Sequence, residues 1–350
     1  MKKLFISMFA LAAVITSCSK SEVMSSRYEN IPISFTTYNG RTPEVKAESV
    51  QDNKTLGEFQ VVAYSTEGEY MNSKLVWDDT NKWGYAVTTE QHYWPGENPL
   101  DFYAFAPLNY TTEKPTMVQL NNDKTLTITV PEYAEDQKDV VVAKADGMKY
   151  SATNTTNDDA TVPGVVTLNF GHMLSRVHFA ITTETAADIT IDDLKLLGTF
   201  NTTGTIDLTK PTLAVSVSSE YETITQDGYT YGYIAEGKSE TVFNLESTGE
   251  LTKSIYTDKL ENRYMMIIPQ TMKDGAIAVK YTFNGVTTDL TGTDDVISFG
   301  TNDAPFTFEA GKSYLFTLKI ATNAISFDVA ITDWDTDTNT NGSTNEFPLY

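Results

Sequence analysis

The sequence is poor in the residues that build disulfide frameworks, metal clusters and basic surfaces. Its 350 residues include one Cys, three His, and 25 Lys and Arg against 47 Asp and Glu, which gives a formal net charge of −22. One Cys excludes an intrachain disulfide, a Cys-rich zinc module and an iron–sulfur site. The shortage of cations argues against binding to duplex nucleic acid, because such proteins cluster Lys and Arg to displace counterions from phosphates. It argues equally against docking on an anionic lipid surface.

Long apolar runs are also scarce. The longest one, Leu4–Ile15, is interrupted only by Ser7 and follows the basic start Met1-Lys2-Lys3. About twelve residues are too few for a membrane-spanning helix, which needs roughly 20, but they suit the apolar core of a secretory signal peptide. We therefore expect residues 1–17 to be a signal peptide and the mature chain to lie outside the cytoplasm.

The only Cys stands directly after this apolar run, in Ile15-Thr16-Ser17-Cys18. Small residues before a Cys at this place resemble a bacterial lipobox, which implies cleavage before Cys18 and a diacylglycerol on its thiol. The alternative is an ordinary signal peptide followed by a chance Cys. The lipobox interpretation predicts a lipoprotein with a polar tether over residues 18–30. Its two or three acyl chains (palmitate among them) would anchor it stably to a membrane, outside the cytoplasm.

Beyond residue 30 the sequence favours an all-β fold. Short runs rich in Val, Ile, Thr and aromatic residues are separated by Gly, Pro, Asn and Asp, which is the pattern of strands and turns. In Leu126-Thr127-Ile128-Thr129-Val130 apolar and polar residues alternate, as in a strand with one buried face. No stretch shows a sustained helical period. The sequence therefore predicts antiparallel β-sandwiches.

The length suits two domains of ordinary size. The polar run Ser151–Pro163 has little to pack and is the expected boundary, although it could instead be a long hairpin loop inside one domain. This division gives an N-terminal β-sandwich over residues 31–163 and a C-terminal β-sandwich over residues 164–334. Residues 335–350 form a polar tail that ends in the apolar Phe347-Pro348-Leu349-Tyr350.

Patterns that could bind a metal are weak. His172 and His178 would share one face of a strand, but Arg176 stands between them, so a structural role is favoured. The run Asp337-x-Asn339-x-Asn341-Gly342 copies the first half of a calcium-binding EF-hand loop. Its twelfth position is Pro348 rather than the required Glu, which favours a solvated tail. We expect no metal site.

Catalytic motifs are not visible. The sequence has no Gly-x-Ser-x-Gly, no P-loop and no His-Glu-x-x-His, so we expect neither an enzyme nor a cofactor. One aromatic cluster, Tyr229, Tyr231 and Tyr233, would place three rings on one strand face. Such a face could stack on a sugar or pack inside a sandwich.

Five segments lie in order across residues 94–334. They are Trp94-Pro95 with Leu100–Pro107, Phe170–Val177, Tyr264–Gln270, Phe308–Tyr314 and Ile331–Trp334. Together they resemble the motifs of the fimbrillin family of Bacteroidales, the Mfa-like and FimA-like pilins and their surface-lipoprotein relatives. The resemblance implies two sandwiches of transthyretin-like type and a structural subunit of a cell-surface fimbria.

The resemblance also implies a mode of assembly. In polymerising members an Arg-specific protease removes the lipidated N-terminal segment with its first strand, and a strand of the next subunit fills the vacated groove. Here the first strand would be Ile31–Tyr38, with Ile31, Ile33 and Phe35 on one face, and Arg41 follows it in an Asn-Gly turn context. We expect proteolytic processing at Arg41, with Arg27 and Lys46 as rival sites.

Two C-terminal segments are candidate donor strands, Ile325–Trp334 and Phe347–Tyr350. The expected partners are other fimbrial subunits of the same or related type and, through the lipid, the outer membrane. The alternative function is a permanently anchored surface lipoprotein or tip adhesin that binds a glycan or a host protein. Cell adhesion is expected in either case, and nucleic acid is not an expected partner.

Overall fold

The computed structural model describes residues 31–38, 56–78, 82–96, 98–108, 117–131, 137–150, 164–183, 189–217, 225–226, 229–234, 265–283, 285–292, 295–321 and 324–333. Its elements are strands, together with one 3-10 turn, η1 (Thr88–Glu90). The predicted all-β fold is confirmed. In these residues no helix is long and apolar enough to cross a membrane.

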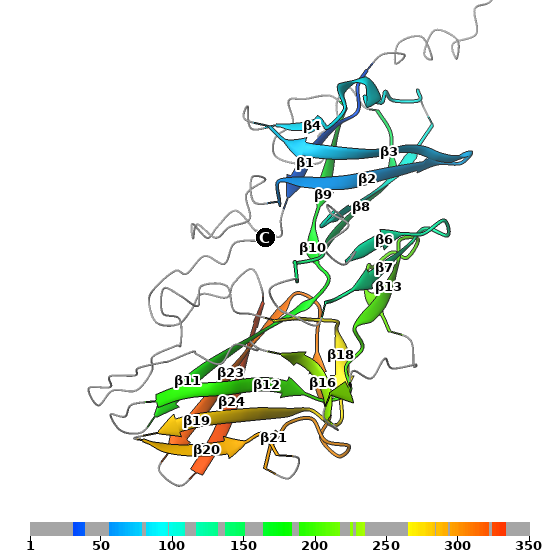
Figure 1. The fold of residues 1–350 in the computed structure, drawn as a ribbon. Helices are drawn as coiled ribbons and strands as arrows, with labels where there is room; N and C mark the ends of the chain where they lie inside the picture. The colour runs from blue at the N-terminus through cyan, green and yellow to red at the C-terminus, as the bar shows by residue number, and fades with distance from the viewer. Residues whose placement is uncertain are drawn as a thin grey trace, which may run out of the picture.

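The upper part of the molecule in Figure 1 is built around a six-stranded antiparallel sheet, in the order β10-β8-β5-β2-β3-β4. Its strands are β2 (Glu58–Ser65), β3 (Gly68–Trp77), β4 (Trp83–Tyr85), β5 (Leu100–Ala106), β8 (Val141–Met148) and β10 (Gly171–His172). The central strands β2 and β5 are buried on both faces. Phe59 and Phe102 belong to one apolar cluster, whereas Val62 and Tyr103 belong to another. Because successive strand residues point to opposite faces, this sheet separates two hydrophobic clusters, one on each face.

A two-stranded parallel sheet covers one face of the six-stranded sheet. It consists of β1 (Ser34–Tyr38) and β9 (Val165–Asn169). Val166 and Leu168 of β9 are fully buried in the same apolar cluster as Phe59 and Phe102. The first sandwich is therefore closed by two strands that come from distant parts of the sequence.

A small four-stranded sheet, β14-β13-β7-β6, packs on the other face. Its strands are β6 (Val118–Leu120), β7 (Thr125–Thr129), β13 (Thr203–Asp207) and β14 (Val215–Ser216). In β7 the apolar Leu126 and Ile128 are buried and the three Thr residues that alternate with them are half-buried, as the alternation predicts. In Figure 1 the labelled strands β6, β7 and β13 lie between the first sheet and the lower part of the molecule.

The lower part is a second sandwich. One sheet has the order β17-β11-β23-β24. The other has the order β15-β16-β12-β19-β20, and β21 also pairs with β19. The strands β18 and β22 form a separate pair. The strands are β11 (Ser175–Thr183), β12 (Ile189–Leu197), β15 (Thr225–Gln226), β16 (Tyr229–Ile234), β17 (Met265–Ile267), β18 (Gln270–Met272), β19 (Ala276–Phe283), β20 (Val286–Leu290), β21 (Ile297–Ser298), β22 (Phe306–Phe308), β23 (Lys312–Ala321) and β24 (Ala324–Asp333).

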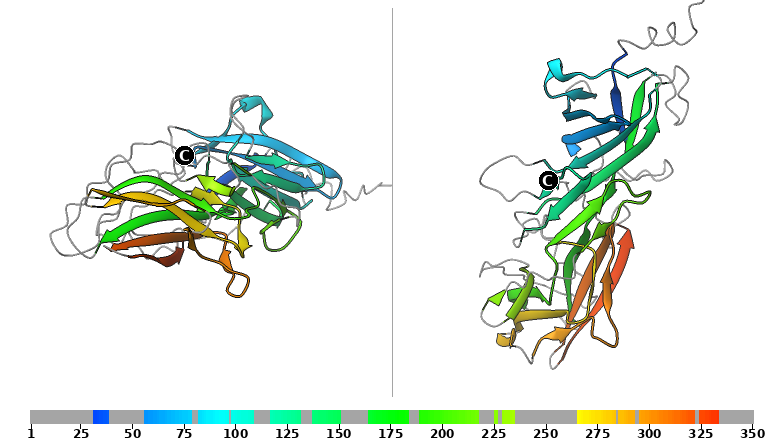
Figure 2. Two further views of the ribbon diagram at one scale, coloured as in Figure 1. Left: turned by 60° about the horizontal axis from the view of Figure 1, so that its bottom comes forward. Right: turned by 90° about the vertical axis from the view of Figure 1, so that its right-hand side faces the viewer.

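Aromatic side chains fill the core of this sandwich. The rings of Phe299 and Phe316 lie 5.2 Å apart, and those of Phe308 and Tyr314 lie 4.9 Å apart in an edge-on arrangement. Such pairs add to the stabilisation that comes from area burial alone. The two sandwiches follow one another along the long axis of the molecule (Figure 2).

Two strand pairs are parallel, β1 with β9 and β11 with β23, whereas the sequence predicts antiparallel sheets throughout. The alternation of apolar residues is the same for both directions, so it does not reveal them. A parallel pair requires a crossover connection, and here each crossover contains several strands of the fold.

The expected domain boundary within residues 151–163 lies outside the described residues and stays a prediction, as does the transthyretin-like type of the sandwiches. Strands that follow this boundary pair with strands that precede it. They are β9 with β1, β10 with β8, and β13 with β7. The chain on both sides of residues 151–163 thus contributes to the upper sheets.

Candidate functional site

The strand β1 occupies a place made by residues far from it in the sequence. Along one edge β1 forms a parallel ladder with β9, with Ser34 opposite Val165 and Tyr38 opposite Asn169. The backbone N–H of Ser34 donates to the carbonyl oxygen of Gly164, at 3.4 Å. We call this place the β1 seat and define it by β4, β9 and residues 92–94.

Residues 92–94 hold the opposite edge of the chain where it enters β1. Pro32 forms an antiparallel bridge with Tyr93. The N–H of Ile33 donates to the carbonyl of His92 at 2.9 Å, and the N–H of Trp94 donates to the carbonyl of Ile31 at 3.0 Å. Backbone hydrogen bonds thus hold residues 31–33 on this edge, whereas the ladder with β9 holds the other edge along β1.

Two apolar side chains of the segment that occupies the β1 seat point into the hydrophobic core of the first sandwich. Ile33 is 1% exposed and Phe35 is 7% exposed. The Phe35 ring lies 5.8 Å from the ring of Phe102 and 6.4 Å from the ring of Tyr85, edge-on in both cases. Burial of such side chains contributes about 1.5–3 kcal/mol each. The strand is therefore part of the hydrophobic core, as the alternation of Ile31, Ile33 and Phe35 predicts.

The short strand β4 adds two side-chain hydrogen bonds to this segment. The indole N–H of Trp83 donates to the Thr37 hydroxyl oxygen at 3.0 Å, and the Tyr85 hydroxyl donates to the Ile33 carbonyl at 3.1 Å. Burial raises the pKa of Tyr85 to about 12, so this hydroxyl keeps its proton at neutral pH. The Trp83 ring is packed against Phe59 at 4.6 Å and Trp77 at 5.1 Å.

A glycine shapes the start of β9. Gly164 has a φ of +83°, a conformation that residues with a Cβ rarely adopt. Its carbonyl accepts both the Ser34 N–H and the Trp94 indole N–H, the latter at 3.2 Å. A Cβ here would lie 3.1 Å from the Trp94 indole nitrogen and 3.4 Å from Ile31. Glycine thus permits the close approach of the chain to the indole.

Comparison with models of protein families shows to which family the chain belongs. The model of a family described as fimbrillin-like matches residues 44–334, most of the chain. This chain belongs to the fimbrillin-like family. No curated protein matches the sequence.

Solved structures of fimbrial proteins resemble this fimbrillin-like chain. A fimbrial protein from Bacteroides vulgatus ATCC 8482 is 18% identical, with 87% of this chain and 100% of that one covered and a TM-score of 0.57. A fimbrillin (fimA) from Porphyromonas gingivalis W83 is 12% identical, with 87% and 98% covered and a TM-score of 0.44. At this identity the first likeness supports the fold alone.

The residues that the sequence singles out for lipidation and cleavage, Cys18 and Arg41, lie outside the described residues, as do Arg27, Lys46 and the segment 347–350. Of the candidate donor Ile325–Trp334, all but Trp334 belong to β24, which pairs with β23 along its whole length. Proteolysis at Arg41 and acylation of Cys18 stay predictions.

The histidine of the fimbrillin-like motif is part of a buried pair. His172 Nδ1 lies 2.6 Å from an Asp139 carboxylate oxygen, and both side chains are buried. Arg176 is buried as well, and its Nε donates to the Ser313 hydroxyl at 3.3 Å. The side chain of His178 lies outside the described residues. In the described part of the chain, no three His, Cys, Asp or Glu residues gather in a way that could hold a metal ion.

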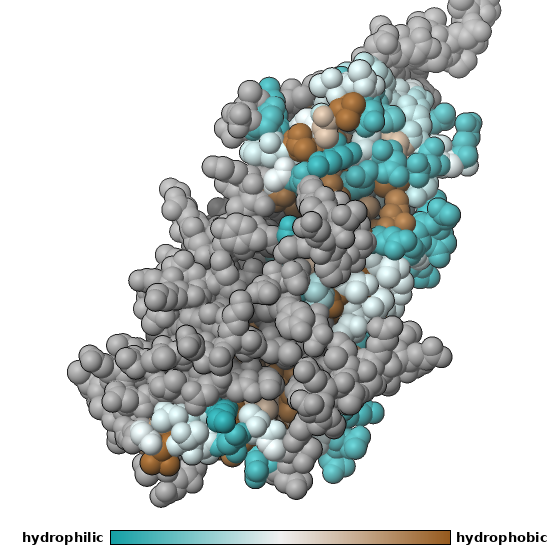
Figure 3. Space-filling view, in the orientation of Figure 1, coloured by the Kyte–Doolittle hydropathy of each residue, from teal (hydrophilic) through white to brown (hydrophobic). Residues whose placement is uncertain are grey.

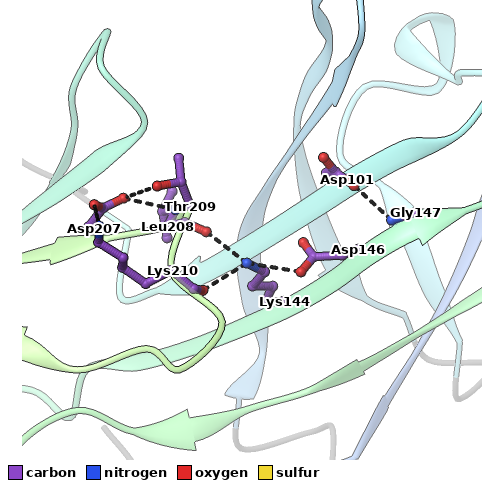
Figure 4. Close-up of polar contacts among 8 residues, drawn as sticks. All are labelled: Asp101, Lys144, Asp146, Gly147, Asp207, Leu208, Thr209 and Lys210. Atoms are coloured by element: carbon purple, nitrogen blue, oxygen red, sulfur yellow. Dashed lines mark hydrogen bonds and ion pairs between the residues drawn. The ribbon is translucent and has the colours of Figure 1, made fainter.

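A polar contact joins the first sheet to the small sheet (Figure 4). The Lys144 ammonium of β8 donates to the carbonyls of Leu208 at 3.2 Å and Lys210 at 2.8 Å, and pairs with the Asp146 carboxylate at 2.9 Å. Three N–H donors thus meet three acceptors. Burial and, next, the Asp146 carboxylate raise the pKa of the neighbouring Tyr103 to about 12. Lys144 therefore fixes the turn after β13 against β8.

Among the residues that the structure describes, exposed large apolar residues are scattered. They are Val87, Tyr93, Val217, Val286 and Ile331. On the face drawn in Figure 3 the brown areas are small and lie among teal and white residues. Single residues of this kind are normal on protein surfaces and point to no docking surface. The site with the most built-in contacts is the β1 seat.

Sequence reasoning identified the strand in the β1 seat but missed the residues that hold it. Trp83 and Tyr85 lie in a strand of three residues, too short for any periodic pattern. Gly164 directly follows the polar run 151–163, which has the composition of a plain loop. Trp94 carries a signal, since the motif Trp94-Pro95 is one of the five that resemble the family.

Proposed function

We propose that this chain is a structural subunit of a cell-surface fimbria that assembles by strand exchange. It is exported as a lipoprotein, acylated at Cys18 and anchored in the outer membrane. Cleavage after Arg41 then removes the lipid together with β1, and a strand of another subunit enters the β1 seat. The fimbrillin-like family supports the fimbrial role at the cell surface.

One observation carries the mechanism. A short N-terminal strand, bounded by Tyr38 and followed three residues later by Arg41, supplies buried side chains to a core otherwise made by residues 56–170. Loss of this strand would expose the core side chains that pack against it, Phe102 among them, and would leave the edge of β9 without its partner. An exposed edge of this kind accepts an extended strand, and head-to-tail repetition gives an open filament.

The experiment compares wild type with Arg41→Ala and with Arg27→Ala as the matched control. Surface protein is analysed by N-terminal sequencing and by electrophoresis in SDS without heating. We expect wild type and Arg27→Ala to start after Arg41 and to give a ladder of SDS-resistant oligomers, which Arg41→Ala abolishes. A mature chain that starts only at Cys18, or a ladder that survives Arg41→Ala, would rule out processing at this site.

The second candidate is a permanently anchored surface lipoprotein or tip adhesin for a glycan or host protein. It is favoured by the many contacts that hold β1, because a strand held by a ladder with β9 and by side-chain hydrogen bonds from β4 can also be a permanent part of the fold. A lipid-labelled, monomeric surface protein whose label disappears in Cys18→Ala would support it. Neither candidate includes catalysis or a cofactor.

A further inference from the structure

The two hydrogen bonds from β4 to the β1 segment differ in what they recognise. Tyr85 donates to the backbone carbonyl of Ile33, which any residue at that position would offer. Trp83 donates to the side chain of Thr37. Only a residue with an acceptor atom in its side chain can make this second bond, so it depends on the sequence of the strand.

The Trp83 indole has little freedom to find another partner. Its ring is held between Phe59 and Trp77, at centroid distances of 4.6 and 5.1 Å. The indole N–H is a donor only, and a donor left unsatisfied in a partly buried place loses the hydration that it has in water. A strand with a purely apolar side chain at position 37 would therefore be held more weakly than one with a hydroxyl.

Other positions of the segment set different requirements. Ile33 and Phe35 are buried, so these two positions require apolar side chains, whereas Thr36 is exposed and sets no such requirement. Pro32 lies at a bridge whose flanking hydrogen bonds use the N–H of Ile33 and the carbonyl of Ile31, so proline fits there.

From these contacts we propose that Trp83 selects the strand that occupies the β1 seat. The selected strand runs parallel to β9, with apolar residues at positions 33 and 35 and a Ser or Thr at position 37. In this chain that strand is β1 itself. Resting on the proposed function, the same rule applies to the extended strand of another subunit that replaces β1.

The test measures how often β1 opens in the full-length chain. Amide hydrogen exchange of the peptide that contains residues 34–38 is followed by mass spectrometry in wild type, Thr37→Ser and Thr37→Val, each with and without Trp83→Phe. With Trp83 present, we expect Thr37→Val to speed exchange about fivefold and Thr37→Ser to change it less than twofold. In the Trp83→Phe background, which lacks the indole donor, we expect Thr37→Val to speed exchange by a clearly smaller factor than it does with Trp83 present.

Tyr85→Phe is the matched control. It removes the bond to the Ile33 carbonyl, so it should speed exchange by the same factor whether residue 37 is Thr or Val. An effect of Thr37→Val that is the same with Trp83 present and in the Trp83→Phe background would overturn the inference. The outcome is separate from the proposed function, because a chain that never forms oligomers can still show this coupling.

Discussion

The segments at β1 and β24 carry the same tripeptide, Ile33-Ser34-Phe35 in the first and Ile325-Ser326-Phe327 in the second. Around β1 the two apolar residues are buried, whereas in β24 they are half-buried. β1 spans five residues and pairs with the distant β9, while β24 spans ten residues and pairs with β23, directly before it. The same local sequence is thus held by distant contacts in one place and by a hairpin in the other.

This difference bears on which strand can leave. The hairpin partner of β24 is its neighbour in the chain, so the loop that must be closed is short and the pairing is easily regained. β1 has no such neighbour, and its retention depends on contacts with residues 83–94 and 164–169. A break in the chain after β1 would therefore leave only non-covalent contacts between β1 and the segments that it pairs with.

The largest effect is expected from removing the shared Phe in each place. Phe35→Ala should lower the free energy of unfolding of the first sandwich by about 3 kcal/mol, because it leaves a cavity beside Phe102. Phe327→Ala should cost about 1 kcal/mol in the second sandwich, since its ring is already half-exposed. Urea titrations followed by amide exchange in β2 and in β23 measure the two losses of unfolding free energy. Equal losses for the two variants would show that β1 and β24 depend on their Phe side chains to the same extent.

A smaller effect is expected at the start of β9. Gly164→Ala should destabilise the first sandwich by about 2 kcal/mol, because the new Cβ meets both an unfavourable φ and the Trp94 indole. Gly285→Ala is the matched control, with a φ of +79° and no atom within 4 Å of the added Cβ. It should cost about 1 kcal/mol, from the backbone alone. Thermal unfolding of both variants tests whether the indole contact accounts for the difference.

The smallest effect is expected on the exposed side of β24. Lys319 forms an ion pair with Asp328 across the β23–β24 ladder, and both side chains are at least half-exposed. Lys319→Ala should change the free energy of unfolding by less than about 0.5 kcal/mol, and salt should remove the difference. A loss above about 1 kcal/mol at high salt would show that β24 depends on this pair more than on its backbone ladder.

The sequence could predict strands but not their partners. The alternation in Thr125–Val130 and in Ile31–Tyr38 correctly identified the buried Leu126, Ile128, Ile33 and Phe35, because period two follows from the strand itself. The parallel pairing of β1 and the burial of β2 and β5 on both faces are decided by tertiary contacts. Trp83 and Thr37 are 46 positions apart, a separation that no local pattern reports.

Sequence reasoning likewise predicted the buried residues of the site but not the hydrogen bonds that hold them. Ile33 and Phe35 follow from their spacing, and the family follows from five short motifs. The hydrogen bonds of Trp83, Tyr85 and Gly164 could not be foreseen, since each depends on a distant chain segment. Cys18 and Arg41 stay predictions from the sequence.

The carbonyl oxygen of Gly164 accepts two hydrogen bonds, and only one of them comes from the β1 segment. It accepts from Ser34 and also from the Trp94 indole, which does not belong to the β1 segment. If β1 were exchanged as proposed, the carbonyl would keep its bond to the indole, so this corner of the β1 seat would stay preorganised. A preorganised site loses less conformational entropy when a strand binds, so the incoming strand would bind more tightly for the same contacts.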